Sequence, residues 1–387
     1  MSSRSVLYHF LLPLVLSAFG ACTFHGGYNR QLLQADSLLS GQPAKALSLL
    51  DSLYPDAQNW AKAQRIRYYL LRAKAQNKSY QSVEDDTLLR QVADYYDRHG
   101  QANDRLAAHY LLGCAYRDKG ESTLAVDCFQ KAIVCVDTTA PDCDFRTLSA
   151  VYSQMADQFH HQLLFTYEIG ASQQAIHYAY LAHDTLSALQ NMEFSAGTYI
   201  LMNRKDSAEI LIKKAISAYQ AKGTAQDVLR GIVILMHLYA EDTPLKQADL
   251  KRLIDYYDSN VNLVGERQRL FIRQHLFYYY KGKYYENTGI LDSAEFYYRK
   301  VPYSRMPYTM LNAYYKGMLN VSAHRHQADS VEKYAKLYCI ANDSSIAIQD
   351  KELTAQLAAS YQYRTIQKQA AEKKCRSGMQ KELLWHF

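Results

Sequence analysis

The sequence has few residues that interrupt regular structure: 7 Pro and 16 Gly among 387 residues. Proline breaks helices and glycine weakens them, so this scarcity excludes a loop-rich or low-complexity chain. Hydrophobic residues make up 48% of the chain and charged residues 21%, which is the composition of a folded protein. The length suits a solenoid or two to three ordinary domains. We expect long helices joined by short turns.

The chain also lacks a block of one charge sign. Its 44 Lys and Arg and its 38 Asp and Glu are spread along the sequence and leave a formal net charge of +6. Proteins that bind nucleic acid gather basic residues on one face or stripe. Binding to nucleic acid is therefore not expected.

Catalytic signatures are missing as well, because the sequence contains no G-x-S-x-G, H-E-x-x-H, P-loop or dinucleotide-binding pattern. Histidines cluster only at His160-His161 and His324-x-His326, and either pair would need further ligands from elsewhere to hold a metal. We interpret them as surface histidines at helix ends. The prediction is a protein that is not an enzyme, has no cofactor or metal, and does not take a small molecule as its main partner.

The first residues differ from the rest of the chain. Arg4 precedes an apolar run, Val6–Phe19, that is shorter than the roughly 20 residues of a membrane-spanning helix. This arrangement predicts a secretion signal over residues 1–21. The segment Phe19-Gly20-Ala21-Cys22 resembles the bacterial lipobox, with Phe19 where Leu is preferred. The resemblance implies lipid attachment at Cys22 and a place in the cell envelope, on the periplasmic side or at the outer membrane. A secreted protein with an incidental Cys and a retained anchor are the alternatives.

Six cysteines remain once Cys22 is assigned, and none forms a C-x-x-C pair. Export permits disulfides, but this number does not require them. The default interpretation is a set of small buried hydrophobic residues, with pairing left open.

One internal unit, from about Asn103 to Thr139, shows two amphipathic helices around a turn. It reads Leu112-Gly113-x2-Tyr116, then Gly120, then Ala125-x3-Phe129-x2-Ala132. The small residues would allow close helix contact, the aromatic residues would fill the space between the helices, and Gly120 would form the turn. This spacing resembles the tetratricopeptide repeat, W-x2-L-G-x2-Y followed by A-x3-F. His109 replaces the Trp, and no Pro closes the unit.

Further copies follow the same spacing. One reads Gly282-x2-Tyr285-x3-Gly289-x4-Ala294-x3-Tyr298, and another reads Ala196-x2-Tyr199-x8-Ala208-x3-Ile212-x2-Ala215 with Asn203 in its turn. We predict an all-α, right-handed superhelical solenoid of about eight antiparallel helix pairs over residues 22–342, and a long C-terminal helix and tail over residues 343–387. Asp206, Asp292 and Asp329, each followed three residues later by Glu, are predicted to cap second helices as capping boxes.

The 34 Tyr are unusually many and are concentrated between Tyr278 and Tyr315. Most are expected to pack, but consecutive tyrosines on a helix cannot all face inward, because neighbours lie about 100° apart. In the repeat family the first helix of each pair lines a concave groove. By offset, this resemblance implies a protein- or peptide-binding groove that contains Tyr110, Cys114, Arg117, Tyr279, Lys283, Glu286 and Asn287. A solvated helix face without a ligand is the alternative.

Asp-Ser/Thr-apolar triplets recur and resemble the O-glycosylation acceptor of exported Bacteroidetes proteins. The resemblance implies possible acceptors at Ser37, Ser52, Thr87, Thr185 and Ser207. Helix starts produce the same triplets, so capping explains them equally well.

The polar segment from Leu353 to Lys374 is similar to the connector in Bacteroidetes tetratricopeptide signalling proteins that joins the repeats to a membrane helix and an output module. The leading hypothesis is a lipid-anchored envelope scaffold for a protein or peptide partner. The alternatives are the sensor region of a signalling protein without its output modules, and a glycan-binding lipoprotein.

Overall fold

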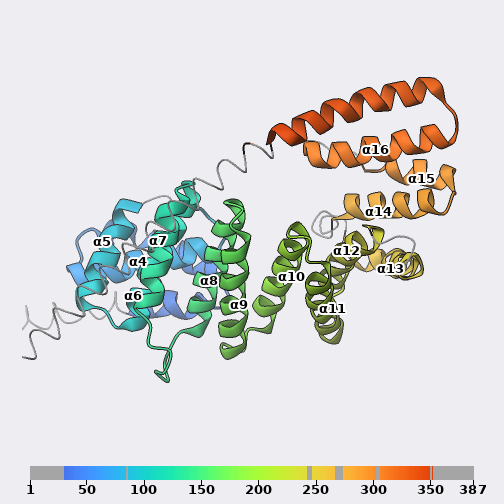
Figure 1. The fold of residues 1–387 in the computed structure, drawn as a ribbon. Coiled ribbons are helices and arrows are strands. Elements are labelled where there is room, and N and C mark those ends of the chain that lie inside the picture. Colours follow the sequence, from blue (N-terminus) through green and yellow to red (C-terminus); the bar gives the residue numbers. More distant parts are fainter. Residues whose placement is uncertain are drawn as a thin grey trace, which may run out of the picture. The chain divides into compact units, whose positions relative to one another are not determined.

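The computed structural model describes residues 30–83, 86–241, 246–265, 273–301, 306–348 and 351. These residues are helical, with short turns and no strand among them (Figure 1). The chain divides into two compact units, Met1–Gln158 and Phe159–Phe387. The all-α fold predicted from the sequence is confirmed. No helix in the described ranges is long and apolar enough to cross a membrane.

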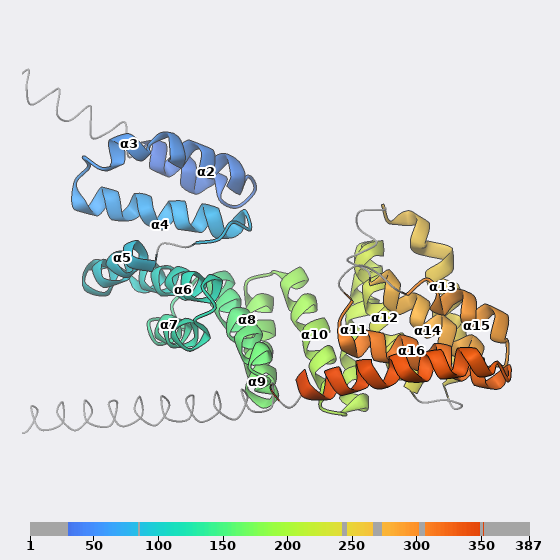
Figure 2. The same ribbon diagram turned by 90° about the horizontal axis from the view of Figure 1, so that it is seen from above.

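The first unit is a series of helix pairs. Its elements are the helix over 30–38, α2 (Pro43–Ser52), α3 (Tyr54–Ala57), α4 (Lys62–Lys78), α5 (Asp86–His99), α6 (Ala102–Asp118), α7 (Ser122–Val134) and most of α8 (Phe145–His161). Seen from above, α2, α4 and α6 follow one another as neighbouring layers (Figure 2). Trp60 and Tyr68 meet edge to face at 5.8 Å in the first of these layers and are nearly fully buried. Each pair thus covers the apolar flank of the next.

The second unit continues the same alternation. Its elements are α9 (Phe165–Leu181), α10 (Thr185–Leu201), α11 (Lys205–Lys222), α12 (Ala225–Glu241), α13 (Gln247–Asn260), η1 (Val261–Leu263), α14 (Gln274–Asn287), α15 (Leu291–Tyr298), α16 (Tyr308–His324) and the helix over 328–348. The core of this unit includes the stacked rings of Tyr257 and Phe277, whose centroids lie 3.8 Å apart.

A residue with a left-handed backbone follows most of the first helices that the structure describes. Gly120 (φ 75°), Asn203 (φ 55°) and Gly289 (φ 76°), which the sequence places in turns, occupy this position, and Tyr80 (φ 56°) and Leu163 (φ 56°) do so as well. The left-handed residue reverses the chain in two or three residues, so the second helix can pack on the first. The turn positions read from the sequence at Gly120, Asn203 and Gly289 therefore match the structure, whereas the turns at Tyr80 and Leu163 were not predicted.

Close contact between a glycine and an aromatic ring holds the pairs together. A Cβ added to Gly113 would lie 2.4 Å from Cε1 of Phe129, and one added to Gly282 would lie 2.7 Å from Cδ1 of Tyr298. Both aromatic side chains are buried, at 0% and 1% exposed. The predicted role of small residues in helix approach is confirmed at both sites.

The predicted capping boxes at Asp206 and Asp292 do not form. α11 begins one residue before Asp206, and α15 begins one residue before Asp292. Both carboxylates therefore lie within the first turn, and neither helix has a side-chain cap. The glutamates three residues later bond to the next helix pair instead. Tyr239 Oη donates to Glu209 Oε1 at 2.8 Å, and Arg325 pairs with Glu295. The Asp residues still favour the positive end of their helices.

Several terminal predictions fall outside the described residues, namely the signal peptide over 1–21, Cys22 and residues 352–387. The boundary predicted at 342/343 lies inside the continuous helix over 328–348. The five described cysteines, Cys114, Cys128, Cys135, Cys143 and Cys339, are all free thiols. Cys114 and Cys128 are buried, at 0% and 4% exposed, as expected for small hydrophobic residues.

Candidate functional site

A groove of about 550 Å³ lies in the second unit and is the candidate functional site. First helices of successive pairs supply its walls: α10, α12 and α14, together with the end of α8. Its apolar wall contains Phe194, Ile200, Leu201, Val233, Ile234 and Leu276. Its polar lining contains His160, Glu193, Arg230, His237, Arg273 and Tyr280. The volume and the mixture of apolar walls with a few polar groups fit a ligand-binding groove.

An ion-pair network fixes the middle of the groove. Arg230 Nε donates to Glu193 Oε1 at 2.6 Å, and its Nη1 lies 2.9 Å from Asp227 Oδ1. Burial lowers the pKa of the Arg230 guanidinium, but its hydrogen bond to Glu193 and the two nearby carboxylates outweigh burial and hold the pKa above its ordinary value. Oε2 of Glu193 is buried and has no hydrogen-bond partner in the described part of the chain. Two carboxylates thus compensate the charge of Arg230, and one buried acceptor remains.

Two histidines are held in place at the sides of the groove. His160 Nδ1 lies 3.4 Å from Oε2 of the fully buried Glu168 and 3.3 Å from Oγ1 of Thr198. His237 Nδ1 lies 2.7 Å from the hydroxyl of Tyr280. Because these contacts restrain the rings, the groove presents a largely preformed surface.

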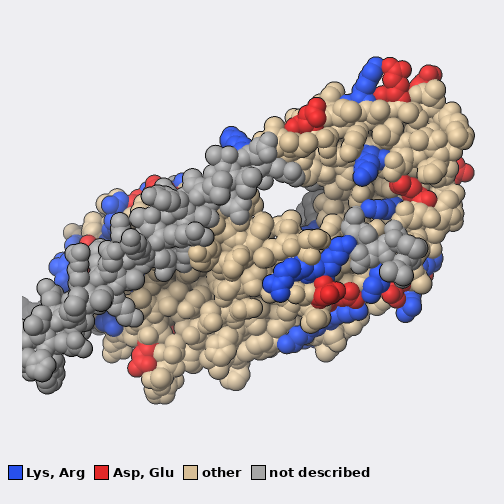
Figure 3. Space-filling view, viewed as in Figure 1, with Lys and Arg blue, Asp and Glu red and all other residues tan. Residues whose placement is uncertain are grey.

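Arg273 stands at the start of α14 in a left-handed conformation, with φ of 54°, and is exposed. Among the described residues it has no ion pair, unlike Arg230. On the face that Figure 3 shows, Lys and Arg over α11–α13 alternate with Asp and Glu. Among the groove residues that the structure describes, Arg273 is thus a cation without a carboxylate partner, in a surface of otherwise mixed charge.

The groove residues predicted on α14 do not line this groove. The helix contributes Arg273, Leu276 and Tyr280 to it, whereas Tyr279 packs against the buried Tyr298 at 5.9 Å between ring centroids. The carboxylate of Glu286 also has partners within the protein. It accepts hydrogen bonds from Tyr298 Oη at 2.5 Å and Asn320 Nδ2 at 2.9 Å. Tyr279, chosen by offset, is one residue away from Tyr280, which lines this groove, and one residue on a helix is about 100°. For Lys283 and Asn287, contact with a partner stays a prediction.

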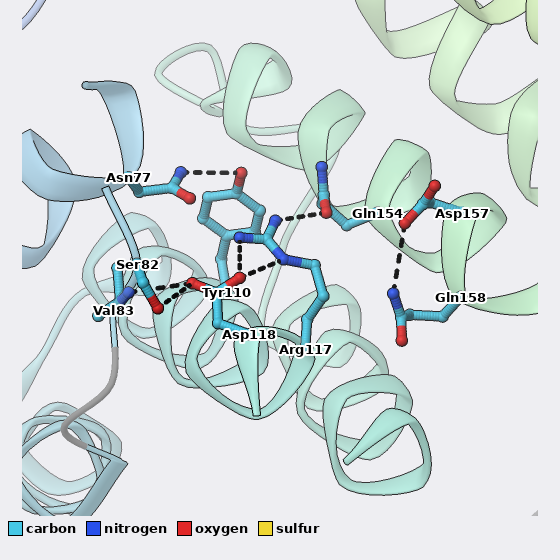
Figure 4. Close-up of polar contacts among 9 residues, drawn as sticks. All are labelled: Asn77, Ser82, Val83, Tyr110, Arg117, Asp118, Gln154, Asp157 and Gln158. Carbon is cyan, nitrogen blue, oxygen red and sulfur yellow. Dashed lines mark hydrogen bonds and ion pairs between the residues drawn. The ribbon is translucent and has the colours of Figure 1, made fainter. Parts of the chain in front are cut away.

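The residues predicted on α6 take part in a polar network between first helices of the first unit (Figure 4). Asn77 Nδ2 of α4 donates to Tyr110 Oη at 3.2 Å, and Arg117 Nη1 donates to Gln154 Oε1 of α8 at 2.6 Å. Arg117 also pairs with Asp118 at 2.7 Å. These bonds join three successive pairs, so Tyr110 and Arg117 lie on one face as predicted, but their polar groups already have partners.

The prediction that Cys114 lines a partner-binding groove is wrong. Its side chain is 0% exposed, and burial raises the pKa of its thiol to about 12. Burial likewise raises the pKa of the neighbouring Tyr110 phenol. A thiol with no exposed surface cannot contact a partner, so Cys114 belongs to the packing between α6 and its neighbours.

The many tyrosines mostly contact one another. The ring of Tyr297 stacks on Tyr285 at 5.6 Å and on Tyr278 at 6.3 Å, and the ammonium of Lys281 lies 4.3 Å from its centroid. Stacking and cation–π contacts of this kind stabilise packing. Of the consecutive tyrosines 278–280, only Tyr280 reaches the groove.

The five predicted glycan acceptors differ in access. Ser37, Ser52 and Thr87 are exposed, whereas Thr185 and Ser207 are half-buried. Before Thr185, the carboxylate of Asp184 accepts the Ser187 backbone N–H at 3.1 Å, which is an N-cap. Capping therefore accounts for that triplet, and glycosylation of the exposed three stays a prediction.

The groove residues of α10 and α12 were missed because neither helix carries the full repeat pattern. Arg230, Val233, Ile234 and His237 have the spacing i, i+3, i+4, i+7 of one helical face, which is the signal available in the sequence. Their side chains point into a common groove only because the helix pairs stack with a particular rotation.

Comparison with known proteins supports the repeat assignment. Residues 106–133, in α6 and α7, match the model of the tetratricopeptide repeat. The chain therefore contains a tetratricopeptide repeat. None of the curated proteins compared matches the sequence.

Solved helical-repeat proteins are similar to the structure at low identity. The tetratricopeptide-like repeats of a kinesin light chain from Podosopora anserina are 20% identical, cover 51% of this chain and 96% of their own, and give a TM-score of 0.38. Aspartyl phosphate phosphatase F from Bacillus subtilis is 14% identical over 88% of this chain and 93% of its own, with a TM-score of 0.47. NprR in complex with its cognate peptide NprX is 12% identical over 89% and 98%, with a TM-score of 0.46.

Proposed function

We propose that this chain is a scaffold of the cell envelope that binds a protein or peptide partner in the groove formed by α10, α12 and α14. The observation that carries this proposal is the groove itself, in which an apolar wall faces a preformed polar network and Arg273, a cation with no ion pair among the described residues. Stacked helix pairs use such concave surfaces to hold extended partners.

The lining indicates the chemistry of the bound segment. An apolar side chain of the partner would lie against Phe194 and Ile200, and a carboxylate would pair with Arg273. The groove thus suits a short acidic segment with a bulky apolar residue.

Substitution at Leu201 tests the groove with little risk to the fold, because this residue is 59% exposed and lines the groove. A photo-crosslinking amino acid at Gln190, also in the groove, would first capture the partner segment from envelope extract. A synthetic peptide of that segment would then be titrated calorimetrically. Leu201→Asp should weaken binding at least tenfold, since losing the burial of a leucine side chain costs about 1.5–3 kcal/mol.

The matched control is Ile210→Asp, at an apolar residue of α11 that is 68% exposed and lies outside the groove. This variant should bind like the wild type, whereas Arg273→Ala should weaken binding of the acidic peptide in a salt-dependent manner. Equal affinities for Leu201→Asp and Ile210→Asp would refute the groove. Weakening by Lys283→Ala instead would favour the face of α14 predicted from the sequence.

We further propose that a lipid on Cys22 anchors the protein to the membrane. The apolar run Val6–Phe19 and the lipobox-like residues before Cys22 support this assignment. Wild-type protein expressed in a bacterium should partition into the detergent phase, and Cys22→Ala should remain in the aqueous phase. Equal partitioning of both proteins would exclude lipidation.

A further inference from the structure

Three potential metal ligands meet in the first unit, away from the polar network of Figure 4. Asp97 lies on α5, His109 lies on α6, and Cys135 is the C-cap residue of α7. One ligand atom from each residue lies within 4.8 Å of the other two. The three side chains are 12 and 26 residues apart in sequence, so only the packing of three helices brings them together.

The donor set is chemically specific. A carboxylate, an imidazole and a thiol together match the ligands of zinc, which is bound by Cys, His and Asp in tetrahedral sites. With bonds of about 2.0–2.3 Å, neighbouring ligands around tetrahedral zinc lie roughly 3.3–3.8 Å apart. The cluster is thus close to the required size, and the distances between its ligand atoms must change by up to about 1–1.5 Å.

The surroundings of the cluster allow this shift. His109 is 6% exposed, its Nε2 lies 2.8 Å from Asp97 Oδ1, and its Nδ1 is buried without a hydrogen-bond partner in the described residues. Because Nε2 faces Asp97, Nε2 is the atom that would bind the cation, and Nδ1 would then carry the ring proton. The Asp97 side chain is 46% exposed, so it can rotate and leave room for the cation and a water.

Two cations, Arg105 and Lys131, lie near the cluster. The Arg105 side chain contacts Cys135, but it also donates to the carbonyl of Gly100 at 2.9 Å. Lys131, on α7, pairs with Asp127 at 2.7 Å. Asp127 thus compensates Lys131, the charge of Arg105 lies beside Cys135, and the cluster keeps the negative charge of Asp97.

We propose that Asp97, His109 and Cys135 form a zinc site with a water molecule as the fourth ligand. On binding, the Cys135 sulfur exchanges its proton for a bond to zinc, and the proton passes to solvent. The cation would join α5, α6 and α7 at the position where His109 replaces the Trp of the repeat pattern. This site is independent of the groove in the second unit and does not rest on the proposed partner.

Metal titration of the full chain tests the site. After dialysis against a chelator, one equivalent of Co²⁺ should produce a thiolate-to-metal charge-transfer band in the near ultraviolet, and Zn²⁺ should remove it by displacement. Cys135→Ser should abolish the band and weaken zinc binding at least tenfold. Asp97→Asn should also weaken zinc binding, but by a smaller factor. Cys339→Ser, which changes an exposed thiol elsewhere, is the control and should bind like the wild type.

A second measurement needs no variant. Zn²⁺ should slow the alkylation of Cys135 by iodoacetamide several-fold and leave that of Cys339 unchanged, as followed by peptide mass spectrometry. The proposal fails if Cys135 is not protected by stoichiometric zinc, or if the charge-transfer band persists in Cys135→Ser. In the second case the metal is bound by other cysteines of the chain.

Discussion

The contact between Gly113 and Phe129 offers the sharpest test of how this fold is held together. In Gly113→Ala the new Cβ would meet Cε1 of Phe129 at 2.4 Å, Cδ1 at 2.6 Å and Cζ at 3.1 Å. Carbon atoms pack best at about 3.5–4.0 Å, so the ring must retreat by roughly 1 Å. It has little room to do so, because Phe129 and its neighbours Ala125 and Ala132 are all 0% exposed.

The expected cost follows from two opposing effects. Overpacking a well-filled core costs about 1–3 kcal/mol, and the upper end applies here because three ring atoms are crowded at once. Alanine recovers about 1 kcal/mol of helix propensity inside α6. Gly113→Ala should therefore lower the free energy of unfolding by about 2 kcal/mol. Urea unfolding followed by far-ultraviolet circular dichroism would measure the loss, and amide hydrogen exchange would locate it in α6 and α7.

Gly170, inside α9, is the matched control because a Cβ added there would meet nothing within 4 Å. Gly170→Ala should raise stability by up to about 1 kcal/mol through helix propensity alone. Adding Phe129→Leu to Gly113→Ala should recover part of the loss, since the smaller side chain relieves the crowding. The reasoning is refuted if Gly113→Ala is as stable as Gly170→Ala.

Three further predictions follow from single residues. Tyr80 is 100% exposed with φ of 56°, so Tyr80→Gly should raise the free energy of unfolding by about 0.5–1 kcal/mol by relieving backbone strain; a decrease in thermal or urea unfolding experiments would contradict this. Tyr298→Phe leaves Glu286 Oε2 without its 2.5 Å bond and should destabilise α14–α16 by about 1–3 kcal/mol, measured by hydrogen exchange; unchanged protection would show that the bond contributes nothing. Hydrogen bonds from Lys119 and Arg90 lower the pKa of Asp86, so its stabilising effect is present above pH of about 4 and is lost as pH falls through the lowered value. Asp86→Asn should therefore flatten the decline of stability between pH 5 and pH 2, and an unchanged slope in acid titrations would oppose this assignment.

The sequence by itself determined the local elements of this protein. Helical spacing and turn residues such as Gly120 and Asn203 specify where helices begin and end, because these signals act within three or four residues. The same short range explains why Gly113 could be matched with Phe129 in the adjoining helix of one repeat. Burial of Cys128 also follows from its place on an apolar helix face.

Only the tertiary structure decided which faces meet between repeats. The rotation of α14 brings Arg273, Leu276 and Tyr280 into the groove and turns Tyr279 toward Tyr298. Glu209 and Glu295 bond forward to the next helix pair instead of back to their own helix starts. The meeting of Asp97, His109 and Cys135 depends on three helices at once. Contacts of this kind depend on small rotations of whole helices. Many packing contacts together set these rotations, and no local pattern in the sequence specifies them.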